Sequence, residues 1–343
     1  MPPPGAGVTD ALLRVRDLVV EFPLGRGTLR AVDGVSFELR QGEALGLVGE
    51  SGSGKTMALR ALVGLLPRTA RITGGSIEFA GQELVGAGEA RLRKLRGREV
   101  SMIFQEPMTA LNPVMAVGEQ IAEAPQVRLG LSRRAARERA LELMRRVGIP
   151  DPVRRSAAYP HELSGGMRQR VMIAIALSAG PRLILCDEPT TALDVTVQDQ
   201  ILKLLRGLQN DLDVGLVFVS HDLAVVAQTC SRVAVMYAGE LVEYGAVEDV
   251  FREPHHPYTL GLLRSVPDFD VVRETLSSIP GSPPDLASPP PGCRFHPRCS
   301  FVRDDCIAAP VPLRVLGGGR SARCLHHEEC AAEARREPLV SSG

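Results

Sequence analysis

The chain has 343 residues, enough for one large α/β unit with an appendage. Lys plus Arg and Asp plus Glu each number 40, so the formal net charge is zero and no basic field favours a nucleic-acid partner. No apolar run approaches the ~18–20 residues that span a bilayer, and residues 1–5 lack the basic and apolar regions of a signal peptide. These features predict a cytosolic protein, either soluble or peripheral to a membrane.

The first part of the chain is predicted to form strands. Apolar side chains alternate with polar ones at Leu13, Val15, Val35, Phe37 and Leu39. Phe22 ends the first strand-like stretch, where it is either a core side chain or a surface on which adenine stacks. The apolar run Ala44–Val48 then predicts a buried strand.

A complete phosphate-binding loop follows that run. The pattern G-x-x-x-x-G-K-[ST] is filled by Gly49, Glu50, Ser51, Gly52, Ser53, Gly54, Lys55 and Thr56. Its glycines let backbone N–H groups face phosphate oxygens, Lys55 can reach the β- and γ-phosphates, and the Thr56 hydroxyl can ligate Mg²⁺. The stretch Met57–Leu66 has the composition of a helix. Strand and helix on either side favour an ATP site over a chance glycine turn.

The middle of the chain is predicted to be helical, over about residues 106–163. Gln105 precedes it, at the end of the strand-like run Val100–Phe104, and offers an amide oxygen to Mg²⁺ or water. Ser132 is expected to cap a helix over Arg133–Val147. The apolar face of that helix is predicted from Leu141, Met144 and Val147, opposite a solvated Arg/Glu face.

A second glycine signature stands about a hundred residues after the loop. It consists of Leu163, Ser164, Gly165, Gly166 and Met167. Ser164 stands where the N-cap of a following helix belongs, and the glycines leave the first-turn amides open to an anion. An ordinary capped helix would look the same, but beside a phosphate loop a second phosphate contact is preferred.

Paired carboxylates end the next apolar run. Asp187 and Glu188 follow Leu183–Cys186, which places them at the edge where α/β sheets bind ligands. Asp187 suits Mg²⁺ binding and Glu188 the role of a general base for water. His221 follows another buried run, Gly215–Val219, and there can sense the γ-phosphate, although a lone His is more often structural.

The composition changes after about residue 255, where a Pro-rich stretch over 280–291 precedes a cluster of cysteines. The cluster is Cys293, Cys299, Cys306, Cys324 and Cys330. In a cytosolic protein such a set indicates a metal rather than disulfides. Five residues separate Cys293 from Cys299, six separate Cys299 from Cys306, and seventeen separate Cys306 from Cys324. None of these spacings is the C-x₂₋₄-C pair typical of zinc ribbons, and wide, irregular spacing suits a metal cluster better than a single ion. His296, His326 and His327 keep a mixed zinc site open, and spacing alone does not decide between them.

The motifs from residue 11 to about 255, together with Ala192–Asp194, resemble the nucleotide-binding subunit of an ABC transporter. The resemblance implies an α/β P-loop NTPase cassette with a RecA-like core, an antiparallel β part and a helical subdomain. It also implies that two cassettes dimerise head to tail, so that residues 163–167 contact the partner's ATP and Asp194 links the two sites. Thr56, Gln105 and Asp187 would then hold Mg²⁺.

The tail, residues 256–343, resembles the C-terminal extension of oligopeptide and dipeptide importer ATPases. The similarity is carried by His256–Thr259 and by Gly292–Cys299. It implies a [4Fe–4S] cluster on Cys293, Cys299, Cys306 and Cys324, with Zn²⁺ as the alternative, and leaves Cys330 without a role. It further implies a D-type subunit that pairs with a homologous ATPase.

We therefore predict an ATP-hydrolysing subunit of a peptide importer at the cytoplasmic face of the cell membrane. Its partners would be two membrane-spanning permease subunits, a second ATPase subunit and an extracytoplasmic substrate-binding protein. An importer of nickel or another small solute is the nearest alternative. A soluble ABC ATPase outside transport is the more distant one, and a metal-sensing role could be added to either.

Overall fold

The computed structural model describes residues 11–25, 27–191, 193–265 and 278–336. Residues 1–5 and Ala192, which entered the sequence predictions, lie outside these ranges. The chain divides into two compact units, one of residues 1–39, 44–85 and 220–343 and the other of residues 40–43 and 86–219. The phosphate loop and the cysteine-rich tail therefore belong to the same unit.

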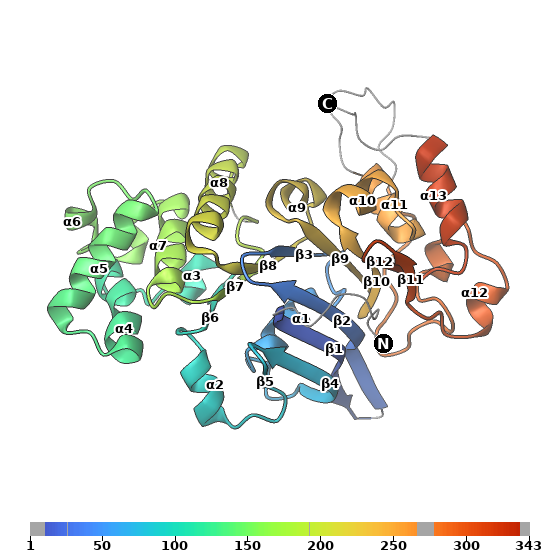
Figure 1. Ribbon diagram of the computed structural model, residues 1–343, viewed down its shortest axis with the longest axis horizontal. Helices are drawn as coiled ribbons and strands as arrows, with labels where there is room; N and C mark the ends of the chain where they lie inside the picture. The colour runs from blue at the N-terminus through green and yellow to red at the C-terminus, as the bar shows by residue number, and fades with distance from the viewer. Residues whose placement is uncertain (1–10, 26, 192, 266–277, 337–343) are drawn as a thin grey trace. The chain divides into compact units, whose positions relative to one another are not determined.

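The first unit holds two groups of strands (Figure 1). One sheet, in the order β2-β1-β4-β5, is made of β1 (Ala11–Leu24), β2 (Gly27–Arg40), β4 (Arg71–Phe79) and β5 (Gln82–Glu83). The other strands neighbour one another in the order β11-β12-β10-β9-β3, namely β3 (Ala44–Val48), β9 (Arg232–Tyr237), β10 (Glu240–Ala246), β11 (Arg314–Gly317) and β12 (Arg320–Ala322). The helices are α1 (Lys55–Leu62), α9 (Leu223–Thr229), α10 (Val247–Arg252), α11 (Pro257–Arg264), the 3₁₀-helix η2 (His296–Arg298), α12 (Asp305–Ala308) and α13 (His327–Arg336).

The second unit contains three parallel strands and most of the helices. The strands β6 (Val100–Ile103), β7 (Leu183–Asp187) and β8 (Gly215–Ser220) pair in the order β8-β7-β6. The helices are α2 (Glu89–Leu95), α3 (Pro107–Ala110), α4 (Val117–Leu129), α5 (Arg133–Arg146), α6 (Pro152–Arg155), the 3₁₀-helix η1 (Pro160–Glu162), α7 (Gly165–Leu177) and α8 (Val195–Leu212). The strands β7 and β8 are buried along their whole length, which is why they appear in the sequence as continuous apolar runs.

The predicted capped helix exists as α5, but its buried face differs from the prediction. Ser132 caps it, since its Oγ accepts a hydrogen bond from Ala135 N at 3.2 Å. Met144 and Val147 are buried as predicted, whereas Leu141 is only half-buried. The true stripe uses two alanines and a different leucine, and it comprises Ala136, Ala140, Leu143, Met144 and Val147. Two of the three predicted residues are thus confirmed, and the alanines were missed because alanine at helical spacing carries little hydrophobic signal.

The predicted helix after the phosphate loop also differs at both ends. We expected Met57–Leu66, but α1 begins at Lys55 and ends at Leu62. Gly64 has a φ of +63°, a left-handed conformation that commonly terminates a helix. None of the helices in the described ranges combines the length and apolar character that a bilayer span requires.

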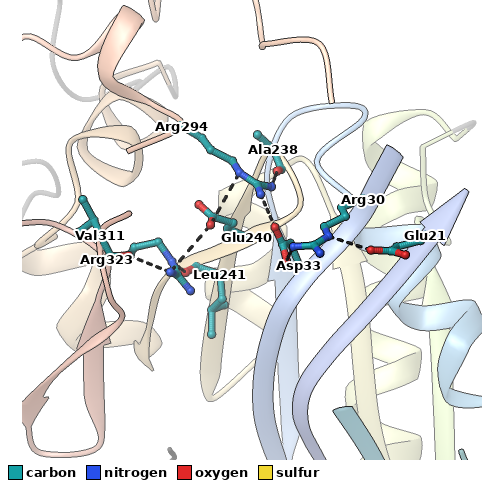
Figure 2. A network of polar contacts seen from close by, with 9 residues as sticks. All are labelled: Glu21, Arg30, Asp33, Ala238, Glu240, Leu241, Arg294, Val311 and Arg323. Carbon is teal, nitrogen blue, oxygen red and sulfur yellow. Dashed lines mark hydrogen bonds and ion pairs between the residues drawn. The ribbon is translucent and has the colours of Figure 1, made fainter. Parts of the chain in front are cut away.

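The tail is built into the first unit rather than attached by a linker alone. Strand β12 pairs antiparallel with β10, with Glu243 opposite Ala322 and Tyr244 opposite Ser321. Two arginines add polar contacts, which Figure 2 shows: Arg294 binds Asp33 and the Ala238 carbonyl, and Arg323 binds the Leu241 and Val311 carbonyls. The predicted boundary at residue 255 is thus crossed by backbone pairing and by ion pairs.

Candidate functional site

The loop after β3 has the backbone that a phosphate cradle needs. Gly49 and Gly54 have φ angles of +150° and +101°. A Cβ on Gly49 would lie 2.1 Å from the Met236 carbonyl oxygen, and one on Gly54 would lie 2.2 Å from that of Ala31. Because both positions are closed to a side chain, the loop can adopt this shape only with glycine there.

Lys55 is the first residue of α1, and its side chain is drawn back along the loop. Its Nζ donates to the Gly49 carbonyl at 2.6 Å and to the Glu50 carbonyl at 2.9 Å. Lys55 is only 4% exposed, so its charge is held beneath the loop. Thr56 follows in the first turn of the helix and is half-buried, whereas Ser51 and Gly52 at the tip are exposed. The arrangement places a cation and a hydroxyl at the start of the helix that follows the exposed tip of the loop.

In the second unit, the carboxylate pair lies at the carboxyl end of β7, as predicted. Asp187 ends that strand and is 3% exposed. Glu188 has a φ of +47°, a strained conformation for a residue with a side chain, and such strain is common at functional positions. Its Oε2 accepts hydrogen bonds from Gln105 Nε2 at 3.4 Å and from Thr191 Oγ1 at 2.9 Å. The structure therefore brings Gln105 and Glu188 together.

The second glycine signature forms the N-terminus of α7. Ser164 is its N-cap, with Oγ accepting from Met167 N at 3.3 Å. Ser164 and Gly165 are exposed, and a Cβ on Gly166 would lie 2.8 Å from Val197 Cγ1. The first-turn amides of an exposed helix N-terminus are suited to an anion. Leu163, in contrast, is only 3% exposed and packs into the core before the turn.

Three further predicted residues have clear positions. Asp194 is exposed and caps α8, with Oδ1 accepting from Val197 N at 3.0 Å. His221 is exposed and follows β8, while Phe22 is half-buried near the end of β1. Phe22, His221 and the phosphate loop belong to the first unit, and Gln105, the carboxylates, the signature and Asp194 belong to the second. Their roles remain predictions.

The four predicted cysteine ligands line one cavity, which confirms that they lie together. Cys293, Cys299, Cys306 and Cys324 share it with Phe295, Phe301, His296 and His326. Burial, with a smaller contribution from the neighbouring thiols, raises the pKa of Cys299 to about 11 and that of Cys324 to about 12. Cys330 is also buried, on α13, but does not line the cavity.

A smaller group of ligand atoms at the cavity was not anticipated in full. Asp305, Cys306 and His326 have ligand atoms within 4.8 Å of one another. His326 Nε2 lies 3.0 Å from Asp305 Oδ1, which lowers the pKa of Asp305. In the ranges that the structure describes, no three of the cysteine sulfurs lie that close. Asp305 adjoins Cys306 in sequence, but an exposed aspartate carries no signal that singles it out.

Sequence reasoning also missed Tyr258 and Arg298, which contact the phosphate loop from the tail. Tyr258 OH accepts a hydrogen bond from Glu50 N at 2.7 Å, and Arg298 forms an ion pair with the Glu50 carboxylate. Both lie within the ranges that carry the family resemblance, His256–Thr259 and Gly292–Cys299, where neither was given a role of its own. No pattern in the sequence pairs positions 248 residues apart.

Comparisons with known proteins identify the family of both parts of the chain. Residues 32–191 match the family described as ABC transporter, and residues 242–306 match the family described as oligopeptide/dipeptide transporter, C-terminal region. The chain is 49% identical to a putative peptide import ATP-binding protein of Brucella abortus over 325 residues, 94% of this chain and 98% of that protein. It is 50% identical to the oligopeptide transport ATP-binding protein OppD of Escherichia coli over 315 residues, 92% of this chain and 93% of that protein.

Solved structures give the same fold. An ATP-binding cassette in a dimeric post-hydrolysis state with ADP and Pi is similar with a TM-score of 0.62 at 27% identity, over 68% of this chain and 98% of that chain. The cassette cbiO1 of Clostridium perfringens is similar with a TM-score of 0.61 at 27% identity, over 71% of this chain and 91% of that chain.

Proposed function

The chain belongs to the ABC transporter family, and we propose how the residues of this peptide-import ATPase divide the work of hydrolysis. It is an ATP-binding subunit that hydrolyses ATP to power oligopeptide or dipeptide import, and it is peripheral to the membrane. The observation that carries the assignment of roles is the phosphate loop, whose glycines exclude side chains and whose Lys55 is held behind it.

The loop residues Gly49–Thr56 would bind the triphosphate, with Lys55 on the β- and γ-phosphates and Phe22 against adenine. Thr56, Gln105 and Asp187 supply hydroxyl, amide and carboxylate oxygens, the donors that Mg²⁺ prefers. Bound there, Mg²⁺ would neutralise charge on the phosphates. Mg²⁺ is the cation expected with ATP, and the side chains of Thr56, Gln105 and Asp187 offer the oxygen donors that it takes.

Glu188 would orient and polarise the attacking water. Its carboxylate is held by Gln105 and Thr191, which fixes its direction at the end of β7. Lys55 and His221 would stabilise the charge on the transferring phosphoryl group. Residues 163–167 would contact the nucleotide of a second cassette, and Asp194 would link the two sites.

Replacement of Glu188 by Gln tests this division. We expect Glu188→Gln to bind ATP with unchanged affinity and to lose on the order of 100-fold or more in turnover, the range typical of a general base. Asp199→Asn is the control, because Asp199 forms a surface ion pair with Lys203 on α8 and should retain full turnover. Turnover of the assembled Glu188→Gln transporter at the wild-type rate would remove Glu188 from the role.

The four cysteines of the cavity are proposed to hold a [4Fe–4S] cluster. Their sulfurs line one cavity but do not converge in threes within 4.8 Å among the described residues. A single tetrahedral zinc ion would need sulfurs about 3.8 Å apart, given Zn–S bonds of about 2.3 Å. The donor set therefore fits a cluster better than one thiolate-bound ion, although Asp305, Cys306 and His326 could hold Zn²⁺.

Metal analysis of protein purified without oxygen separates the two sites. About four irons and four acid-labile sulfides per chain are expected, with loss of both in Cys293→Ser. Cys330→Ser is the matched control and should keep the iron, because Cys330 lies outside the cavity lining. Zinc that survives Cys293→Ser would instead assign the metal to Asp305, Cys306 and His326.

For partners, we propose two permease subunits, a second homologous ATPase and a substrate-binding protein. The family and the dimeric cassette structure support membrane subunits and a cassette dimer. Isolation of the full chain from native membranes, followed by identification of the bound subunits, tests the heterodimer. Recovery of two identical ATPase chains would contradict it, and a binding protein for nickel would shift the substrate to that alternative.

A further inference from the structure

Arg298 of the tail forms an ion pair with Glu50 of the phosphate loop. Arg298 is the last residue of η2, and its guanidinium forms two parallel bonds to the Glu50 carboxylate, Nη1 to Oε2 at 2.7 Å and Nη2 to Oε1 at 3.0 Å. Glu50 is the second residue of the loop. The side chain of Arg298 is 5% exposed and that of Glu50 is 28% exposed. A two-pronged ion pair with this much burial is among the stronger polar contacts in proteins.

The remaining donors of Arg298 fix its orientation. Its Nε donates to the Pro280 carbonyl at 2.8 Å, Nη1 to Tyr237 OH at 3.3 Å, and Nη2 to the Ile279 carbonyl at 3.5 Å. With the two bonds to Glu50, all five N–H groups of the guanidinium have acceptors. The Glu50 carboxylate raises the pKa of Arg298, which stays charged. The guanidinium of Arg298 is therefore held in one orientation by its hydrogen bonds, unlike that of an arginine on the surface.

A tyrosine holds the same loop residue by its backbone. Glu50 N donates to Tyr258 OH at 2.7 Å, and Tyr258 is fully buried at 0% exposure. The Glu50 carbonyl in turn accepts from Lys55 Nζ at 2.9 Å. Thus the residue that the tail holds by its side chain and its N–H group also positions the lysine that meets the phosphates.

Arg298 also adjoins the cysteine-lined cavity in sequence. Arg298 directly precedes Cys299, and Phe295, three residues earlier, also lines the cavity. The Phe295 ring packs against Tyr237 and Tyr258, with centroids 5.2 and 5.5 Å apart. A shift of the cavity wall would therefore be transmitted through one short helix and three aromatic rings to Glu50.

We propose that Arg298 is a positioning residue for ATP binding, which fixes the phosphate loop through Glu50 and makes its shape depend on the cysteine-lined site. Arg298 touches no substrate atom itself. The dependence on the cysteine site rests on the proposed metal site, whereas the positioning of Glu50 does not.

A double-mutant cycle on the full chain tests the contact, with the Kd of a fluorescent ATP analogue as the readout. Arg298→Met should weaken binding about tenfold, because it leaves the Glu50 carboxylate uncompensated beside the phosphates. Glu50→Gln should weaken it less, and adding Glu50→Gln to Arg298→Met should restore part of the loss. Turnover of Arg298→Met at saturating ATP should stay within about twofold of wild type, as for a residue that acts on binding alone.

Conservative variants and a matched control separate positioning from loss of fold. Arg298→Lys should bind ATP more tightly than Arg298→Met, because lysine keeps the positive charge beside Glu50. It should still bind less tightly than wild type, because lysine cannot form the bidentate pair. Arg323→Met is the control. Arg323 is half-buried and also precedes a cavity cysteine, yet it binds Leu241, Val311 and Glu240 rather than the loop. Additive effects in the cycle, or an equal loss of affinity in Arg323→Met, would overturn the positioning role.

The coupling is tested with Cys293→Ser, which removes a proposed ligand. ATP affinity should fall in Cys293→Ser relative to the metal-loaded wild type, and this difference should vanish when both proteins also carry Glu50→Gln. If the difference in ATP affinity stays as large in the Glu50→Gln background, the cysteine site does not act through Glu50. If the wild-type protein contains no metal, the proposed cluster and its coupling to the loop are both wrong. The double-mutant cycle of Arg298 and Glu50 does not depend on that result.

Discussion

Glu243 is a buried carboxyl group whose ionisation should weaken the fold. It lies on β10 and its side chain is 1% exposed. It accepts hydrogen bonds from His255 N at 2.7 Å and His256 N at 3.0 Å, and the Arg320 guanidinium lies 3.7 Å away. Burial outweighs these favourable contacts and raises the pKa of Glu243 to about 7.

The raised pKa fixes the sign of the effect. The folded protein holds this proton more tightly than the unfolded chain, so the stability contributed by the protonated Glu243 is complete below the ordinary value of 4.5 and is lost as pH rises through about 7. At ~1.4 kcal/mol per pKa unit, the loss approaches about 3 kcal/mol by pH 8. Glu243→Gln cannot ionise, but its amide nitrogen replaces one of the two oxygens that accept from His255 N and His256 N, at a cost that does not change with pH. The stability of the variant relative to wild type should therefore rise by about 2–3 kcal/mol between pH 5 and pH 8.

Urea unfolding of both proteins at pH 5, 6, 7 and 8 measures this difference in free energy of unfolding. Comparison at each pH cancels the histidines and other groups that the two proteins share. Glu138→Gln is the control, since Glu138 is 65% exposed and pairs with Arg134 on the helix surface, so its small effect should not grow with pH. A difference for Glu243→Gln that stays constant or reverses with pH would show that Arg320 and the two backbone donors keep the carboxylate charged in the folded protein.

Two further predictions concern the phosphate loop. Lys55→Ala should weaken ATP binding on the order of 100-fold, measured with a fluorescent nucleotide, and unaltered affinity would contradict the loop assignment. Gly49→Ala should destabilise the protein by about 2 kcal/mol or more in thermal unfolding, because its Cβ would strike the Met236 carbonyl. Gly207→Ala on α8 is the comparison, since nothing lies within 4 Å of its Cβ and a gain of about 0.5–1 kcal/mol is expected there; equal losses in both would refute the steric argument.

Much of the site was predictable because its signals are local. The runs that became β3, β7 and β8 are continuously apolar, and each leads directly into chemically distinctive residues. The caps Ser132 and Ser164 were also found, since a cap depends on residues within one helical turn. In parallel strands such neighbours meet at one edge, which is why Gln105 and Glu188 could be expected close together.

The parts that could not be predicted depend on pairing across the chain. The contact of Arg298 with Glu50 joins positions 248 residues apart, and neither residue type indicates a partner. The bounds of α5 were predicted closely and Met144 and Val147 were expected on its buried face, but Ala136 and Ala140 were missed because a methyl side chain gives little hydrophobic signal. The cysteines were recognisable as a set. The family resemblance left Cys330 without a role, and the fold adds that it does not line the cavity of the other four.

The cysteine site and the nucleotide loop are best understood as two ends of one folded unit. Glu240, a carboxyl group on β10 whose pKa is raised by burial, lies between Arg294 and Arg323 of the tail (Figure 2). Arg294 also pairs with Asp33 on β2. Removal of the tail would take both arginines from Glu240, whereas Asp33 would keep its ion pair with Arg30 at 3.3 Å. A partly buried carboxylate without a partner costs more than an exposed ion pair contributes. The tail therefore supplies the cations that pair with Glu240 on β10 and with Glu50 in the phosphate loop.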